Sequence, residues 1–233
     1  MLSAMPAAAH LALLLLAIAL TSQTPPAMHG TWVVTAAEGK PFPAGIHVAM
    51  IIGPRGYQGA TNGTIDERGT VVVDDTKTPT AIDLVISEGK SAGKTQIGIV
   101  EVTGDTMRLA LGEPGDPTRP SSFATGALTV TRLKPLAKEL AGTWDATIAL
   151  GATTQRVALT LTNGSDGFGS GTIAAAESTG AGTPIGAVVQ MGPTVRVIIP
   201  AARATFDGTL EGNQLRGTWT QGRQSAPAVF TRR

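Results

Sequence analysis

The chain has 233 residues, enough for one large or two small domains, and its 29 glycines with many threonines and valines favour short strands and frequent turns. Its 18 basic and 17 acidic residues leave a net charge of +1, so no basic surface for nucleic acid is expected. The lack of cysteine excludes disulfides, thiol nucleophiles and zinc–thiolate sites.

The first feature along the chain is an apolar stretch over residues 7–20 (AAAHLALLLLAIAL). This stretch is too short to cross a bilayer and has the length of a signal-peptide core. Small and polar residues follow it, then two prolines. We therefore expect residues 1–27 to be a signal peptide and the protein to be exported to the periplasm, the cell surface or the medium, with no membrane span after its removal. An uncleaved membrane anchor is the alternative.

Residues 28–133 are predicted to form a first domain of about eight short strands. The domain opens on GTWVVTAA, from Gly30, and closes on ALTVTRL at 127–133. Apolar and other residues alternate along runs such as TMRLALG, as expected of a strand with one buried face. Turn signals, including Asn62-Gly63 for a type I′ hairpin, recur at the spacing typical of a barrel or sandwich.

A linker is expected over 134–140, where a Lys-Pro step ends the last strand. Residues 141–233 then repeat the plan, opening on GTWDATIAL and closing on APAVFTRR. A further Gly-Thr-Trp, ending at Trp219, lies on the predicted penultimate strand and cannot begin a domain. It predicts that the second barrel packs two indoles inside.

Each domain thus pairs a tryptophan on its first strand with an arginine on its last, namely Trp32 with Arg132 and Trp144 with Arg232. In a closed barrel the first and last strands are neighbours. The arginine can then lie across the indole, a cation–π contact worth about 0.5–2 kcal/mol. The tryptophan side chain is expected to plug the end of the barrel, and the glycine before it lets the backbone pass close to the indole. We therefore assign the four residues a structural role in closing one end of each barrel.

Gly-X-Trp on the first strand with Arg on the last resembles the lipocalin superfamily. Residues 28–134 are similar to a lipocalin-like domain family of exported bacterial proteins over GTWVVTAAEGKPFP, KTPTAIDLVISEG, GKTQIGIVEVTGDTMRLAL and GDPTRPSSFAT. They depart from it at Val100 (an aromatic residue is expected), Ala110 (cysteine is common) and Ser122 (which replaces an acid). Residues 139–233 resemble a β domain that precedes secreted hydrolases, over LAGTW, SGTI, FDGTLEG and LRGTWTQG. The resemblances imply an all-β protein of two small lipocalin-like antiparallel β-barrels in tandem, and bring no catalytic residue.

Enzyme motifs such as G-x-S-x-G, the P-loop and H-E-x-x-H do not occur in the sequence. Beyond the leader the histidines are His29 and His47, which are expected to be solvent-exposed or hydrogen-bonded residues without a metal or acid–base role. Asp74-Asp75 follows a strand and should cap a turn, and Asp83 should make a structural hydrogen bond. No catalytic residue, cofactor or metal ligand is predicted.

The leading hypothesis is a non-enzymatic exported protein whose first barrel takes a small apolar ligand, because eight strands leave room for packed side chains or one small ligand. The alternative is a scaffold of filled barrels that binds another envelope protein or a polysaccharide, which the short glycine-rich strands of the second domain favour. An enzyme with its catalytic residues on loops is a third hypothesis. The interior volume of each barrel discriminates among them.

Overall fold

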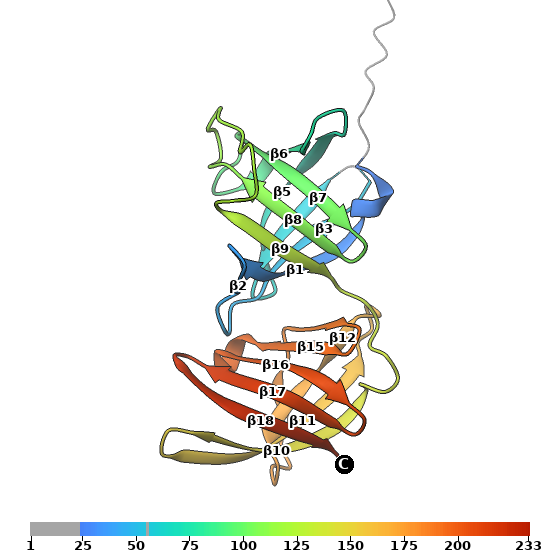
Figure 1. Cartoon of the computed structure of the whole chain (residues 1–233), viewed down its shortest axis with the longest axis vertical. Coiled ribbons are helices and arrows are strands. Elements are labelled where there is room, and N and C mark those ends of the chain that lie inside the picture. The colour runs from blue at the N-terminus through green and yellow to red at the C-terminus, as the bar shows by residue number, and fades with distance from the viewer. Residues whose placement is uncertain (1–23, 55) are drawn as a thin grey trace, which may run out of the picture.

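The computed structural model describes residues 24–54 and 56–233, and these form two antiparallel sheets of nine strands each. The sheets follow one another along the chain and lie one above the other in Figure 1. Within the described residues the helices are two short 3-10 turns, η1 (Pro26–Met28) and η2 (Pro200–Ala202). The all-β tandem architecture predicted from the sequence is confirmed. The apolar stretch 7–20 lies outside the described residues.

The first sheet is a closed barrel of eight strands with one short additional strand, β2, paired to β1. Its strands pair in chain order, and β1 also pairs with β9, which closes the ring. The strands are β1 (Gly30–Ala37), β2 (Lys40–Pro41), β3 (Val48–Ile52), β4 (Tyr57–Thr61), β5 (Thr64–Asp74), β6 (Thr80–Gly89), β7 (Thr95–Thr103), β8 (Thr106–Leu111) and β9 (Ala127–Arg132).

Alternation along these strands separates an interior from an exterior, because successive side chains point to opposite faces. On β6, Ile82 and Leu84 are buried in the core whereas Val85 is 41% exposed. The hairpin between β4 and β5 turns at Asn62 and Gly63, whose φ angles are +51° and +83°. Positive φ at both central residues is what a type I′ turn requires, and Asn-Gly supplies it at low cost.

The second sheet is curled, and its first and last strands, β10 and β18, are neighbours in the middle of it. Its order is β13-β12-β11-β10-β18-β17-β16-β15-β14, and among the described strands no ladder joins the two ends. The strands are β10 (Gly142–Leu150), β11 (Thr153–Asn163), β12 (Gly169–Ala175), β13 (Thr183–Pro184), β14 (Ala187–Met191), β15 (Thr194–Ile199), β16 (Ala204–Glu211), β17 (Gln214–Gln221) and β18 (Gln224–Arg232).

The segment expected to be a linker, 134–140, packs into the second sheet instead. Leu136 and Leu140 are buried in the core cluster of that sheet, and the amide of Leu140 donates to the carbonyl of Ala137 in a turn. Two leucines four residues apart reach the same side of such a turn. The connection between the two cores is therefore shorter than the predicted linker 134–140, because Leu136 already belongs to the second core.

Residues 24–28 belong to the first barrel. The amide of Thr24 donates to the carbonyl of Pro54, the side chain of Met28 lies in the core, and the carbonyl of Ala27 accepts a hydrogen bond from Arg132. A leader that ended at Ala27 would remove part of this end of the barrel. The signal peptide itself stays a prediction, since residues 1–23 are not described.

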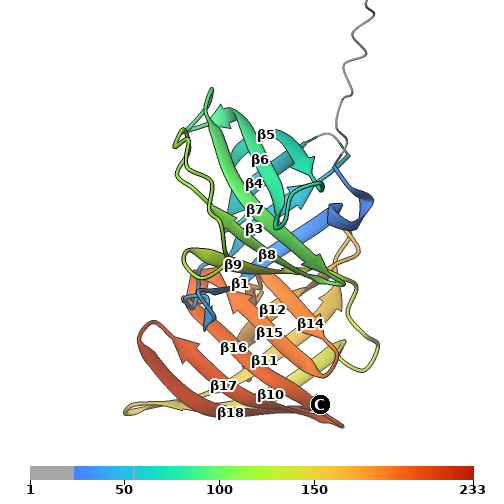
Figure 2. The ribbon, with the colours of Figure 1, turned by 45° about the horizontal axis from the view of Figure 1, so that its top comes forward.

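The outer face of the first barrel packs against the outer face of the second sheet. Val33 and Ala49, which point outward from β1 and β3, share a buried apolar cluster with Ala187, Val189 and Ile198 of β14 and β15. Figure 2 shows β14 and β15 directly beneath β1 and β9. This contact fixes the two domains against each other.

Candidate functional site

The interior of the first barrel contains a cavity of about 450 Å³. Every long strand of the barrel contributes to its wall, and the inward side chains are mainly aliphatic. The aliphatic lining comprises Val34, Val48, Met50, Leu84, Leu109, Leu111, Leu128 and Val130. The cavity exists because these side chains are of medium size and because Gly59 on β4, at an inward position opposite Met50, has no side chain to fill the space.

Polar side chains gather at one end of this cavity, which we call the rim: Thr61, Asp66, Glu67, Lys90 and Gln96. They lie at the β4–β5 and β6–β7 hairpins, at the opposite end of the strands from Trp32. An aliphatic wall with a few polar groups at one end is the usual make-up of a small-molecule site.

Tyr57 and Glu67, which both line the cavity, are joined by a hydrogen bond. The Tyr57 side chain is buried in the barrel core, and its hydroxyl donates a 2.7 Å hydrogen bond to Oε1 of the Glu67 carboxylate. Burial raises the pKa of Tyr57, and the hydrogen bond to Glu67 and the charge of that carboxylate raise it further. The phenol therefore stays protonated and remains a donor to Glu67.

The other end of the barrel is closed by the predicted pair Trp32 and Arg132, which the structure brings together. The guanidinium carbon of Arg132 lies 4.1 Å from the centroid of the fully buried Trp32 ring. Nε1 of Trp32 donates to the carbonyl of Met28, and the guanidinium donates to the carbonyls of Ala27 and His29. The indole is thus held on one face by a cation and at its edge by the chain that enters β1.

The second sheet repeats this closure at the same relative positions. The guanidinium carbon of Arg232 lies 4.2 Å from the centroid of the Trp144 ring. Nε1 of Trp144 donates to the carbonyl of Leu140, and Arg232 donates to the carbonyls of Glu139 and Ala141. In both domains the acceptors lie three, four and five residues before the tryptophan, so the two closures have the same construction.

The interior of the second sheet, in contrast, is filled by large side chains. Phe206 and Phe230 are fully buried with ring centroids 5.0 Å apart, and the Trp219 ring lies 6.3 Å from that of Phe230. Trp144 and Trp219 both belong to this core, as the third Gly-Thr-Trp predicts. A hollow of about 150 Å³ lies at one end, beside the β10–β11 and β17–β18 hairpins.

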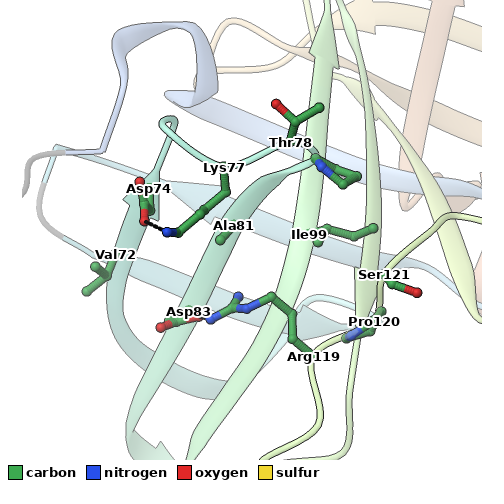
Figure 3. A pocket seen from close by; sticks show the side chains of 11 residues that line it. Val72, Asp74, Lys77, Thr78, Ala81, Asp83, Ile99, Arg119, Pro120 and Ser121 are labelled. Atoms are coloured by element: carbon green, nitrogen blue, oxygen red, sulfur yellow. Dashed lines mark ion pairs between the residues drawn. The ribbon is translucent and has the colours of Figure 1, made fainter.

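An outer cleft of about 600 Å³ lies between strands β5–β7 and residues 119–121, on the outside of the first barrel (Figure 3). Nη2 of Arg119 lies 2.6 Å from Oδ1 of Asp83, and Nη1 donates to the carbonyls of Ile82 and Gly98. Asp83 therefore anchors the loop that carries Arg119 through an ion pair, in place of the hydrogen bond expected of it.

The turn after β5 forms the other wall of this cleft. Oδ1 of Asp74 accepts hydrogen bonds from the amide and the hydroxyl of Thr76, and Oδ2 lies 3.9 Å from Nζ of Lys77. The hydrogen bonds from Thr76 lower the pKa of Asp74, with a smaller contribution from the charge of Lys77. Asp74 thus caps the turn as predicted.

Neither histidine of the described residues lies in the cavity. Nε2 of His29 is 2.8 Å from the carbonyl oxygen of Thr24, and His47 is buried beside Gly186 of the second domain, where burial lowers its pKa. In residues 24–54 and 56–233 no cluster of three His, Cys, Asp or Glu side chains is arranged to hold a metal ion. No helix in that part of the chain is long and apolar enough to cross a membrane.

Arg196 on β15 joins the two domains, and no motif in the sequence indicates this role. Its guanidinium is buried and donates to the carbonyls of Thr35 and Phe42 in the first domain, at 2.8 Å and 2.6 Å. Asp207 lies 3.5 Å away as its counter-ion, and burial of the pair lowers the pKa of Arg196 and raises that of Asp207. Phe42 packs against the core of the first barrel, so Arg196 holds a segment that covers this core.

Comparison with family models, with curated proteins and with solved structures finds no match to this chain. The assignment of a function therefore depends on the geometry of the molecule. The feature that distinguishes the two domains is the interior: the first has a cavity of about 450 Å³ and the second is packed with aromatic and aliphatic side chains.

Proposed function

We propose that the protein is an exported carrier whose first barrel binds one small apolar ligand. The observation that supports this proposal is the aliphatic cavity of the first barrel beside the filled interior of the second. Both domains use the same tryptophan–arginine closure, so the empty space is a property of the first barrel's lining and does not follow from the shared construction.

The size and lining of the cavity define the ligand. A volume of about 450 Å³ lies within the range of about 300–1,000 Å³ common for small-molecule sites. Side chains such as Leu84, Leu109 and Val130 offer no hydrogen bond, so a ligand gains free energy there through burial of its own apolar surface, about 25 cal/mol per Å². A compact or flexible hydrocarbon skeleton fits these conditions, and a highly polar molecule does not.

The second domain, in this proposal, supports the first. Its buried cluster with Val33 and Ala49 and the hydrogen bonds of Arg196 hold one side of the first barrel. A carrier does not need a catalytic group, and the proposal assigns none. The other functions predicted from the sequence, an envelope scaffold and an enzyme with loop residues, stay predictions.

Displacement of an apolar fluorescent dye tests the proposal, with two variants of one strand as a matched pair. Val48 lines the cavity, whereas Ile51 on the same strand points outward and is 39% exposed. Val48→Trp fills part of the cavity and is expected to weaken dye binding at least about tenfold, the effect of 1.4 kcal/mol. Ile51→Trp adds the same indole outside the barrel and should leave binding within about twofold.

Native mass spectrometry gives the stoichiometry. We expect one equivalent of an added apolar compound per chain, retained by the Ile51→Trp variant and lost by Val48→Trp. No uptake by the wild-type chain, or equal uptake by the two variants, would reject the carrier function.

A further inference from the structure

Glu67 is the least exposed of the three charged residues at the rim of the first barrel's cavity. It lies on β5 at a position that faces inward with Val71, and its Cβ approaches the inward face of Gly59 on β4. Its Oε1 is fixed by the buried Tyr57 hydroxyl at 2.7 Å. Oε2 has no hydrogen-bond partner among the described residues, so one oxygen of a positioned carboxylate in the cavity lining can accept a further hydrogen bond.

The remaining charges of the rim are Asp66 and Lys90, and both side chains are exposed. Asp66 accepts a 2.6 Å hydrogen bond from the Thr61 hydroxyl. No ion pair joins Lys90 to Glu67 in the described part of the chain, and the Gln96 amide nitrogen already donates to the carbonyl of Gly112. Two carboxylates against one ammonium make the rim net negative, and water screens the exposed charges more than the half-buried Glu67.

We propose that the ligand of the first barrel is an amphiphile with a cationic amine head group, bound by Glu67 at the rim with its apolar tail toward Trp32. This inference rests on the proposed function and adds the chemical class of the ligand. Oε2 of Glu67 accepts from the ammonium while Oε1 keeps its bond from Tyr57. A head group that is a carboxylate would meet the half-buried Glu67 as a like charge.

The Tyr57 hydroxyl does not compensate a ligand carboxylate, because its proton is already donated to Glu67. Lys90 can approach an anionic head group only in solvent, where an ion pair contributes about 0–1 kcal/mol. A hydrogen bond to the half-buried, charged Glu67 contributes more, about 1.5–3 kcal/mol. The net charge of the whole chain, +1, gives a cationic ligand no general attraction that could mimic this preference.

Competition with the apolar dye by decylamine, decanol and decanoate, below their micellar concentrations and at neutral pH, tests the inference. The three compounds share one tail and differ in the head group. For the wild-type chain we expect decylamine to bind about tenfold tighter than decanoate, the effect of one charge-assisted hydrogen bond. Decanol should bind with intermediate affinity. Decanoate binding as tightly as decylamine would overturn the inference.

The Glu67→Gln variant tests whether Glu67 causes the preference for decylamine over decanoate. The amide oxygen of glutamine still accepts the Tyr57 hydrogen bond, so the variant keeps the barrel contact and loses the charge. We expect the ratio of decylamine to decanoate affinity to fall to about one, with decanol unchanged within about twofold. Glu88→Gln is the matched control. Oε2 of Glu88 lies 2.7 Å from Nη1 of Arg68 in solvent, so this substitution removes the same charge from outside the barrel.

The outcomes separate this inference from the proposed function. Binding of dye and decanol without a preference for the amine, or a preference that persists in Glu67→Gln, would overturn the inference alone. Failure of the dye and of all three compounds to bind would overturn the proposed function.

Discussion

Gly30 and Gly142 show why each domain opens on glycine. Their φ angles are +136° and +137°, in a region that other residues rarely adopt. A Cβ atom at either position would also lie within 2.7 Å or less of the guanidinium nitrogen Nη1 of Arg132 or Arg232. Glycine is therefore required both by the backbone and by the arginine that covers the indole.

Replacement of Trp32 by alanine tests the importance of this closure. The indole is fully buried, so Trp32→Ala is expected to lower the free energy of unfolding by about 3–5 kcal/mol. Chemical denaturation followed by circular dichroism measures the loss. Val85→Ala, at an outward position 41% exposed, is the control and should change stability by less than about 1 kcal/mol. A loss below about 1 kcal/mol for Trp32→Ala would contradict the claim that the Trp32 indole closes the end of the barrel.

At the scale of strands, the alternation of apolar residues predicts which side chains of the first barrel face inward. The prediction fails where a β-bulge shifts the pairing of two strands. Val71 points inward on β5, and the same alternation would place Ile65 inside. The pairing of β4 and β5 shifts at Asp66, where Gly59 opposes Glu67 and Ala60 opposes Ile65. This bulge turns Ile65 to solvent, because one extra residue exchanges the two faces.

The segment 134–140 shows a second limit of sequence reasoning. A Lys-Pro step ends a strand, but it does not show whether the following turn is exposed or packs against a core formed by residues elsewhere in the chain. Leu136 and Leu140 reach the second core through tertiary packing, which local propensity does not encode. The closure residues were predictable because a repeated motif marks both ends of each domain.

Leu140→Ala distinguishes a linker from a core segment. Leu140 is fully buried, and its truncation should destabilise the protein by about 2–5 kcal/mol in a denaturation experiment. Lys138→Ala, at an exposed position of the same turn, should stay within about 0.5 kcal/mol of the wild type. Equal, small effects of the two substitutions would mean that the segment is a linker after all.

The two domains are not independent of each other. The buried guanidinium of Arg196, in the second domain, donates hydrogen bonds to backbone carbonyls of the first. The sequence could not reveal this contact, since carbonyl acceptors have no residue signature. The same is true of the cavity: its volume results from the sizes of side chains that meet from eight strands. The Glu67 site likewise depends on a hydrogen bond whose partners only the fold brings together.

Arg196→Met tests the junction between the domains. The substitution leaves the carbonyls of Thr35 and Phe42 without their charged donor, and we expect a loss of about 2–3 kcal/mol. Arg216→Met is the matched control, because Arg216 pairs with Glu211 in solvent, where an ion pair contributes about 0–1 kcal/mol. Denaturation curves that coincide for the two variants would show that the junction contributes no stability.

The location of a bound ligand tests the carrier function most directly. With isotope-labelled methyl groups, nuclear Overhauser contacts from bound decanol should reach Leu84, Leu109 and Val130 in the first barrel. They should not reach Leu159 or Leu161, which lie in the filled core of the second domain. Contacts at saturation to the second set, or to neither set, would contradict the proposal that the first barrel holds the ligand.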